Sequence, residues 1–184
     1  MKLPRWKWWQ WTLAVFAGLM ALGIIGNIIS PPEPTTPVAT APVDPLEGLR
    51  KANAAYRNVR LDGSTLHIET KARDVDAAAR EIERIGRWLA KNPSFPADTL
   101  SVKFVLGTVD RLGNEGEAGM FDATFSVADM RAAKFDNLSW STILGLAVTA
   151  SATSPLGFQS VAEWCAVRDN ISFTGARFCN KASM

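Results

Sequence analysis

The stretch STLHIETKARDVDAAAREIERIGRWLAK, residues 64–91, combines a strand pattern with a helix pattern. From Leu66 to Lys71 the side chains alternate between those suited to a core and those suited to water, which is typical of a strand with one buried face. From Asp74, whose carboxylate can cap free helix amides, an apolar stripe at helical spacing follows. The stripe consists of Val75, Ala78, Ala79, Ile82, Ile85 and Leu89. Pro93 and Pro96 end this helix, which we expect to pack over the sheet that contains the strand.

Three further strands are predicted around this unit. Val59–Leu61 precedes Asp62-Gly63, a pair typical of a type I′ hairpin turn, so it forms a hairpin with the strand at 64–70. Residues 100–108 and 121–127 alternate in the same way and are joined by a long glycine-containing loop. The order is strand, strand, helix, strand, strand. We therefore predict an α+β fold: a two-layer domain with an antiparallel sheet in ββαββ order and helices over one face.

Helices are expected at both ends of this domain. Residues 46–56 can form a short helix before the first strand. Residues 136–148 are apolar nearly all round and too short to cross a bilayer, so they predict a buried helix. Ser160, with Glu163 three residues later, predicts a capping box that opens another helix. The C-terminal third is thus expected to close the domain as a helical segment.

Residues 1–29 predict a membrane anchor. The run from Trp8 to Ile29 has 22 residues without a charge, and as a helix it would be about 33 Å long, enough for a hydrocarbon core of about 30 Å. Lys2, Arg5 and Lys7 precede the run, whereas the next basic residue after it is Arg50. This asymmetry predicts a cytoplasmic N-terminus and places the rest of the chain outside the cytoplasm.

A cleaved signal peptide is the alternative for these residues. Its best cleavage motif is Ala39-Thr40-Ala41, which lies well beyond the apolar run and directly before Pro42. The apolar run is also longer than a usual signal core, so an uncleaved, single-pass signal anchor is favoured. Ala14 and Gly18, small residues four apart, allow two such helices to approach closely, which leaves a homo-oligomer as an open alternative.

Residues 30–45 predict a spacer between the anchor and the domain. They contain six of the ten prolines in the chain, which favour an extended polyproline II conformation. Fully extended, such a linker reaches about 50 Å. The predicted organisation is therefore an anchor at 1–29, a linker at 30–45 and an extracytoplasmic domain at 46–184.

Composition limits the chemistry of this domain. The chain is 47% hydrophobic and 21% charged, which excludes a wholly disordered protein. A net charge of +2 without a basic stripe disfavours nucleic acid as a partner. His67 is the single histidine and there are two cysteines, which excludes sites with two imidazoles or four thiolates. No metal site or cofactor is expected, and a loose cation loop around Asp110 is disfavoured against a plain turn.

Cys165 and Cys179 are the two cysteines, and the predicted topology places both in an oxidising compartment. A disulfide between them is the favoured interpretation. The alternative is a catalytic cysteine with His67 as its base, which would leave the other cysteine without a role.

The architecture favours a function in binding over a function in catalysis. We expect a membrane-anchored, extracytoplasmic binding or assembly module of a cell-envelope complex, located at the cytoplasmic (inner) membrane with its domain in the periplasm. The alternative is a small envelope-directed hydrolase that uses His67 with acidic partners. The strand patterns place His67, Glu69, Lys103 and Asp122 on a polar sheet face that is poorly suited to an interface core.

Large apolar residues are concentrated in the C-terminal third of the chain. Some of them are expected to form a partner surface, because aromatic residues concentrate in interface cores, and the competing interpretation is that they close the domain core. The candidates for the partner surface are Trp140, Leu156, Phe158 and Trp164, with Phe173 and Phe178 in the same apolar surplus.

Overall fold

The computed structural model describes residues 46–167 and 175–182. The predicted anchor (1–29) and linker (30–45) lie outside the described residues, as does Phe173. Across the described ranges, no helix is both long and apolar enough to cross a membrane.

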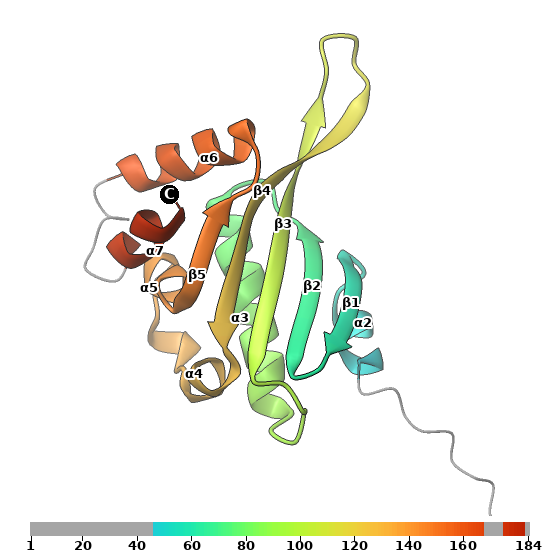
Figure 1. Cartoon of the computed structure of the whole chain (residues 1–184), viewed down its shortest axis with the longest axis vertical. Coiled ribbons are helices and arrows are strands. Elements are labelled where there is room, and N and C mark those ends of the chain that lie inside the picture. Colours follow the sequence, from blue (N-terminus) through green and yellow to red (C-terminus); the bar gives the residue numbers. More distant parts are fainter. Residues whose placement is uncertain (1–45, 168–174, 183–184) are drawn as a thin grey trace, which may run out of the picture. The chain divides into compact units, whose positions relative to one another are not determined.

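The domain begins with α2 (Glu47–Ala52), followed by the hairpin of β1 (Tyr56–Asp62) and β2 (Thr65–Lys71). The long helix α3 (Val75–Lys91) leads to a second hairpin, β3 (Thr99–Val109) and β4 (Glu115–Ser126). The remaining elements are α4 (Val127–Ala132), a 3-10 turn (Phe135–Asn137), α5 (Trp140–Gly145), β5 (Ala147–Ala152), α6 (Pro155–Ala166) and α7 (Gly175–Ala182). The fold is α+β, with a mixed sheet of five strands (Figure 1).

The sheet has the order β1-β2-β3-β4-β5, and its β2–β3 pair is parallel while the other pairs are antiparallel. The prediction of an antiparallel sheet was therefore wrong at its centre. The reason is the helix between these strands: α3 returns the chain to the end of the sheet where β2 began. A strand that follows such a crossover and pairs with its predecessor runs parallel to it.

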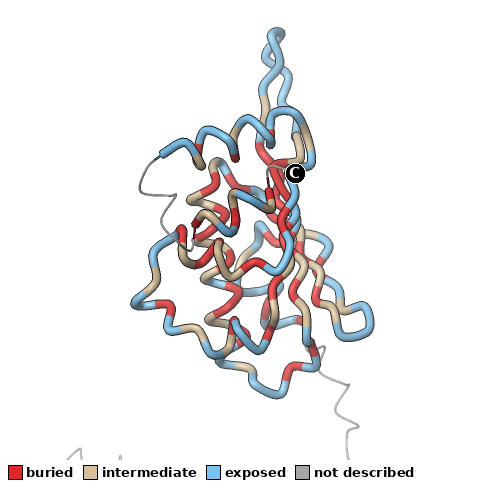
Figure 2. Tube along the Cα trace, turned by 60° about the vertical axis from the view of Figure 1, so that its left-hand side comes forward, coloured by how far each residue is buried: buried red, intermediate tan, exposed pale blue. Residues whose placement is uncertain are grey.

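The predicted ββαββ order and the amphipathic helix are both present. Asp74 caps α3 by accepting a hydrogen bond from the amide of Ala77 at 2.6 Å. Every member of the predicted stripe is buried, from Val75 to Leu89. The helix lies behind the sheet in Figure 1, and in Figure 2 the buried residues gather between the sheet and the helices. The core therefore occupies one face of the sheet, and no helix of the described residues covers the other face, which we call the open face.

The hairpin turn between β1 and β2 differs from its prediction. The loop consists of Gly63 and Ser64, and of these two only Gly63 has a positive φ, at +57°. A type I′ turn needs positive φ at both central residues, whereas type II′ needs it only at the first. The turn type I′ was therefore wrong, although the hairpin itself is present.

The predicted helix at 136–148 was wrong at both ends, since the α-helix there covers only Trp140–Gly145. The structure ends α5 at Gly145 and continues as β5, which pairs with Phe121–Phe125 of β4. Ala147 and Ala150 are buried, whereas the side chain of Val148 is 56% exposed. A short apolar run fits a strand and a helix equally well, and here the otherwise unpaired edge of β4 decides in favour of the strand.

The next helix also begins earlier than predicted. Ser154 caps α6 by accepting a hydrogen bond from the amide of Gly157 at 3.0 Å, and Pro155 occupies the first turn. Ser160 and Glu163 consequently lie inside this helix, and the predicted start at Ser160 was wrong. Proline fits the first turn of a helix because its missing amide hydrogen is not needed there.

Cys165 and Cys179 form a disulfide, as predicted, and it joins α6 to α7. Beneath it, Phe178 is fully buried and packs edge-on against Phe121 of β4 and Trp164 of α6. The indole of Trp164 donates a hydrogen bond to Asp76 of α3 at 2.8 Å. The C-terminal helices therefore close the core on the same side of the sheet as α3.

Candidate functional site

The open face of the sheet carries two rows of polar side chains that cross all five strands. We call the first the donor row; its members are neighbours in register, in the order Arg60, His67, Ser101, Thr124 and Thr149. We call the second the charged row; it contains Arg57, Glu69, Lys103, Asp122 and Ser151. The placement of His67 and Glu69 on this polar face agrees with the strand pattern.

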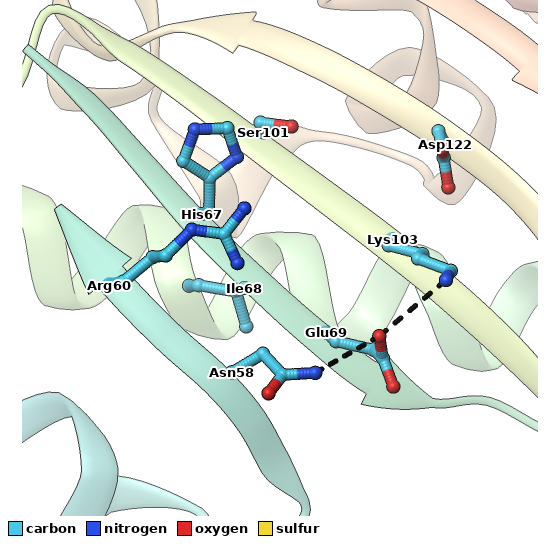
Figure 3. Close-up of a pocket in the computed structure, with 8 residues that line it drawn as sticks. All are labelled: Asn58, Arg60, His67, Ile68, Glu69, Ser101, Lys103 and Asp122. Atoms are coloured by element: carbon cyan, nitrogen blue, oxygen red, sulfur yellow. Dashed lines mark hydrogen bonds and ion pairs between the residues drawn. The ribbon is translucent and has the colours of Figure 1, made fainter. Parts of the chain in front are cut away.

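Members of both rows on β1 to β4 line a shallow hollow of about 270 Å³. Figure 3 shows the guanidinium of Arg60 extending over β2 beside His67, while Asp122 lies at the far side on β4. Ser101 lies beyond His67, and Lys103 stands between Glu69 and Asp122 (Figure 3). This volume is near the lower limit for small-molecule sites, so the hollow suits a small ligand.

A β-bulge in β1 brings Arg57 and Arg60 to the same face. The register shifts between these two residues, which an unbroken strand would direct to opposite faces. Asn58 lies in the bulge with a φ of +52°, a left-handed conformation that asparagine tolerates better than most residues. Its side-chain amide donates to Glu69 at 3.3 Å. The bulge therefore places both Asn58 and Arg60 at the hollow.

Most charges near the hollow are paired with one another. The carboxylate of Glu69 lies 3.5 Å from the guanidinium of Arg57 and 3.6 Å from the ammonium of Lys103. Arg57 also donates two hydrogen bonds to Glu117, at 3.0 and 3.2 Å, and Lys71 contacts the same carboxylate. Hydrogen bonds from Arg57 and Lys71 lower the pKa of Glu117 to about 2. In this network three cations are paired with two carboxylates.

Two charges of opposite sign at the hollow stand apart from this network. Within the described residues, Arg60 makes no hydrogen bond and no ion pair, and the same holds for Asp122. Partial burial against the sheet raises the pKa of Asp122, and the nearby Lys103 ammonium partly offsets this effect. Arg60 lies on β1 and Asp122 on β4, so the two charges stand at opposite sides of the hollow.

Among the described residues, no acidic side chain orients the imidazole of His67. In the described part of the chain, its imidazole makes no hydrogen bond or ion pair with a carboxylate. Glu69, the acid that shares its strand and face, is instead held by Arg57, Asn58 and Lys103. A histidine base that activates a nucleophile is normally oriented by a third group, and no such arrangement is present among these residues.

The predicted partner residues fall into two groups. Leu156 and Phe158 are exposed on the first turn of α6, by 43% and 50%. Trp140 is also partly exposed, with the guanidinium of Arg80 placed 5.7 Å from the ring centroid. Trp164, in contrast, is buried and helps to close the core. An apolar hollow of about 320 Å³ lies between α6 and α7, beside Phe158 and the disulfide.

The loop at 110–114 is stabilised by its own hydrogen bonds. Both carboxylate oxygens of Asp110 accept hydrogen bonds within the loop, from the amides of Leu112 and Asn114 and from the Asn114 side chain. These bonds lower the pKa of Asp110. Among the described residues, no group of three or more histidine, cysteine, aspartate or glutamate side chains is arranged to hold a metal ion.

The strand patterns predicted His67, Glu69, Lys103 and Asp122 on this face but did not predict Asn58 and Arg60 there. The bulge that redirects β1 leaves only a weak signal, an asparagine inside a strand. In comparisons with known proteins, no family model, curated protein or solved structure matched this chain.

Proposed function

We propose that this protein is a membrane-anchored, extracytoplasmic binding module of a bacterial cell-envelope complex. Residues 1–29 hold it in the cytoplasmic membrane, residues 30–45 act as a spacer, and the α+β domain binds its partners in the periplasm. The domain recruits or positions other components and does not transform them.

The observation that carries this proposal is the disulfide between Cys165 and Cys179. Disulfides persist mainly in oxidising compartments, so a structural disulfide supports a location outside the cytoplasm. The uncharged run from Trp8 to Ile29, with basic residues only on its N-terminal side, supports the same orientation. The location and the anchor therefore rest on independent features of the chain.

Leu156 and Phe158 are the residues through which we propose that a protein partner docks. Both side chains are exposed on one turn of α6, next to the apolar hollow that the disulfide borders. Aromatic side chains such as that of Phe158 are enriched in the cores of protein interfaces. The partner is an envelope protein or a second copy of this chain.

The single substitutions Leu156→Ala and Phe158→Ala are each expected to abolish crosslinking of the full-length protein to its partner in cells. The melting temperature should stay within about 2 °C of the original, because both side chains are largely outside the core. In-cell crosslinking with mass spectrometry, followed by thermal unfolding of the purified variants, measures both effects.

Leu112→Ala is the matched control, since Leu112 is 82% exposed at the tip of the β3–β4 hairpin, in a separate part of the domain. This variant should keep its crosslinks. A fall in melting temperature for Leu156→Ala or Phe158→Ala with crosslinking intact would show that these residues serve the core and not a partner.

A further inference from the structure

The hollow on the open sheet face has a charge pattern that suits a ligand with two charged ends. Among the described residues, Arg60 offers a cation without a hydrogen-bond or ion-pair partner at one side, and Asp122 offers a carboxylate without one at the other. Between them, the ammonium of Lys103 lies 3.6 Å from the carboxylate of Glu69, which also lies 3.5 Å from the guanidinium of Arg57. A ligand of one charge would meet one matching and one repelling end, whereas a zwitterion matches both.

The middle of the hollow offers neutral groups for hydrogen bonds. The hydroxyl of Ser101 and the imidazole of His67 lie along the donor row between the two ends (Figure 3). The amide of Asn58, which is held by its bond to Glu69, borders the same space. Backbone amides of a peptide carry both donors and acceptors, so a peptide can use these groups along its length.

The span between the two ends fits a short peptide. Three strand spacings and two residues along a strand separate Arg60 from Asp122, which corresponds to about 16 Å between their Cα atoms. The charged groups are closer together than that, because the Arg60 side chain extends over β2 (Figure 3). An extended tripeptide spans about 10 Å and a tetrapeptide about 13 Å, and both are shorter than the separation of the two Cα atoms.

We infer that this hollow binds a short peptide by its two termini, with Arg60 contacting the C-terminal carboxylate and Asp122 contacting the N-terminal ammonium. Two donors of a guanidinium match a carboxylate in a bidentate arrangement, which makes arginine suited to the first role. The inference rests on the proposed function as a binding module and names the ligand class of a surface separate from Leu156 and Phe158.

The test uses the purified full-length protein in lipid nanodiscs and saturation-transfer NMR, a method that detects weak binding. The probes are Ala-Ala-Ala with free ends, its N-acetylated form and its C-amidated form. The free peptide should bind several-fold more tightly than either blocked form, because each block removes one charge. Arg60→Ala and Asp122→Asn should each weaken the free peptide about three- to fivefold, the effect expected for an exposed ion pair.

The assignment of each end is tested by combining the variants with the blocked peptides. In Arg60→Ala, amidation should have no further effect, while acetylation still weakens binding; Asp122→Asn should show the reverse. Arg111→Ala in the hairpin loop and Asp129→Asn in α4 are matched controls and should bind like the original protein. Both control positions are away from the hollow.

Equal binding of free and blocked peptides, or equal sensitivity of both variants to both blocks, would overturn the inference. An absence of detectable binding of the free peptide at 10 mM would overturn it as well. These outcomes are independent of the cellular location and of the partner at Leu156 and Phe158. A failure here therefore leaves the proposed function standing, and a cytoplasmic location would overturn the proposed function without affecting peptide binding.

Discussion

Gly157→Ala is expected to lower the free energy of unfolding by about 3 kcal/mol, the upper end of the usual range for overpacking. Gly157 lies in the first turn of α6, where the helix touches the backbone of β4. A methyl group at this position would come within 2.1 Å of the carbonyl oxygen of Met120 and 2.6 Å of that of Gly119. Backbone atoms of a central strand cannot move aside cheaply, so α6 must shift away from the sheet.

Urea unfolding of the two proteins measures this effect, and Gly48→Ala is its control. Gly48 also lies in a helix, but a methyl group there meets its nearest atom, the indole nitrogen of Trp88, at an ordinary 3.7 Å. Because alanine favours helices over glycine by about 1 kcal/mol, Gly48→Ala should be neutral or stabilising. If the free energy of unfolding of Gly157→Ala lies within about 0.5 kcal/mol of that of the original protein, the close packing of α6 against the backbone of β4 would be contradicted.

Removal of the disulfide has the second large expected effect. The double substitution Cys165→Ser and Cys179→Ser should lower the free energy of unfolding by about 3 kcal/mol, because the bridge closes a loop over a sequence separation of 14 residues. The bridge ties α7, with the buried side chain of Phe178, to α6. Urea unfolding with and without a reductant measures the loss.

Reductant should lower the stability of the original protein to that of the double variant and leave the double variant unchanged. Alkylation of the native, unreduced protein provides an independent readout, and neither sulfur should react. Equal stability of the oxidised and reduced protein would show that α7 is held by its packing alone.

The helix α3 and the strand β2, whose patterns are strongly periodic, were predictable from the sequence. The elements with ambiguous patterns were not. The stripe from Val75 to Leu89 repeats at helical spacing over several turns, so the local sequence predicts a helix there without information on tertiary contacts. Residues 147–152 are mostly small and apolar, a composition that fits a strand or a buried helix, and their state depends on the distant edge of β4. The parallel β2–β3 pair likewise depends on where α3 returns the chain.

The candidate site shows the same division. His67, Glu69 and Asp122 were placed on the polar face because they alternate with residues that are buried in regular strands. Arg60 was missed because its direction depends on the bulge at Asn58, which shifts the alternation of β1 by one residue. Local departures from a regular strand leave almost no trace in the sequence, although they decide which side chains meet at a site.

The central claim, that this domain lies outside the cytoplasm with its cysteines joined, is tested most directly by thiol labelling in cells. A maleimide that cannot cross the cytoplasmic membrane is applied to cells whose outer membrane has been opened. Cys165 and Cys179 should react only after reduction, with the cytoplasmic membrane intact. The substitution Lys2→Cys, made in the variant with Cys165→Ser and Cys179→Ser, places a single cysteine on the predicted cytoplasmic side. This cysteine should react only after lysis. Labelling of the native cysteines without a reductant, or only after lysis, would contradict the account.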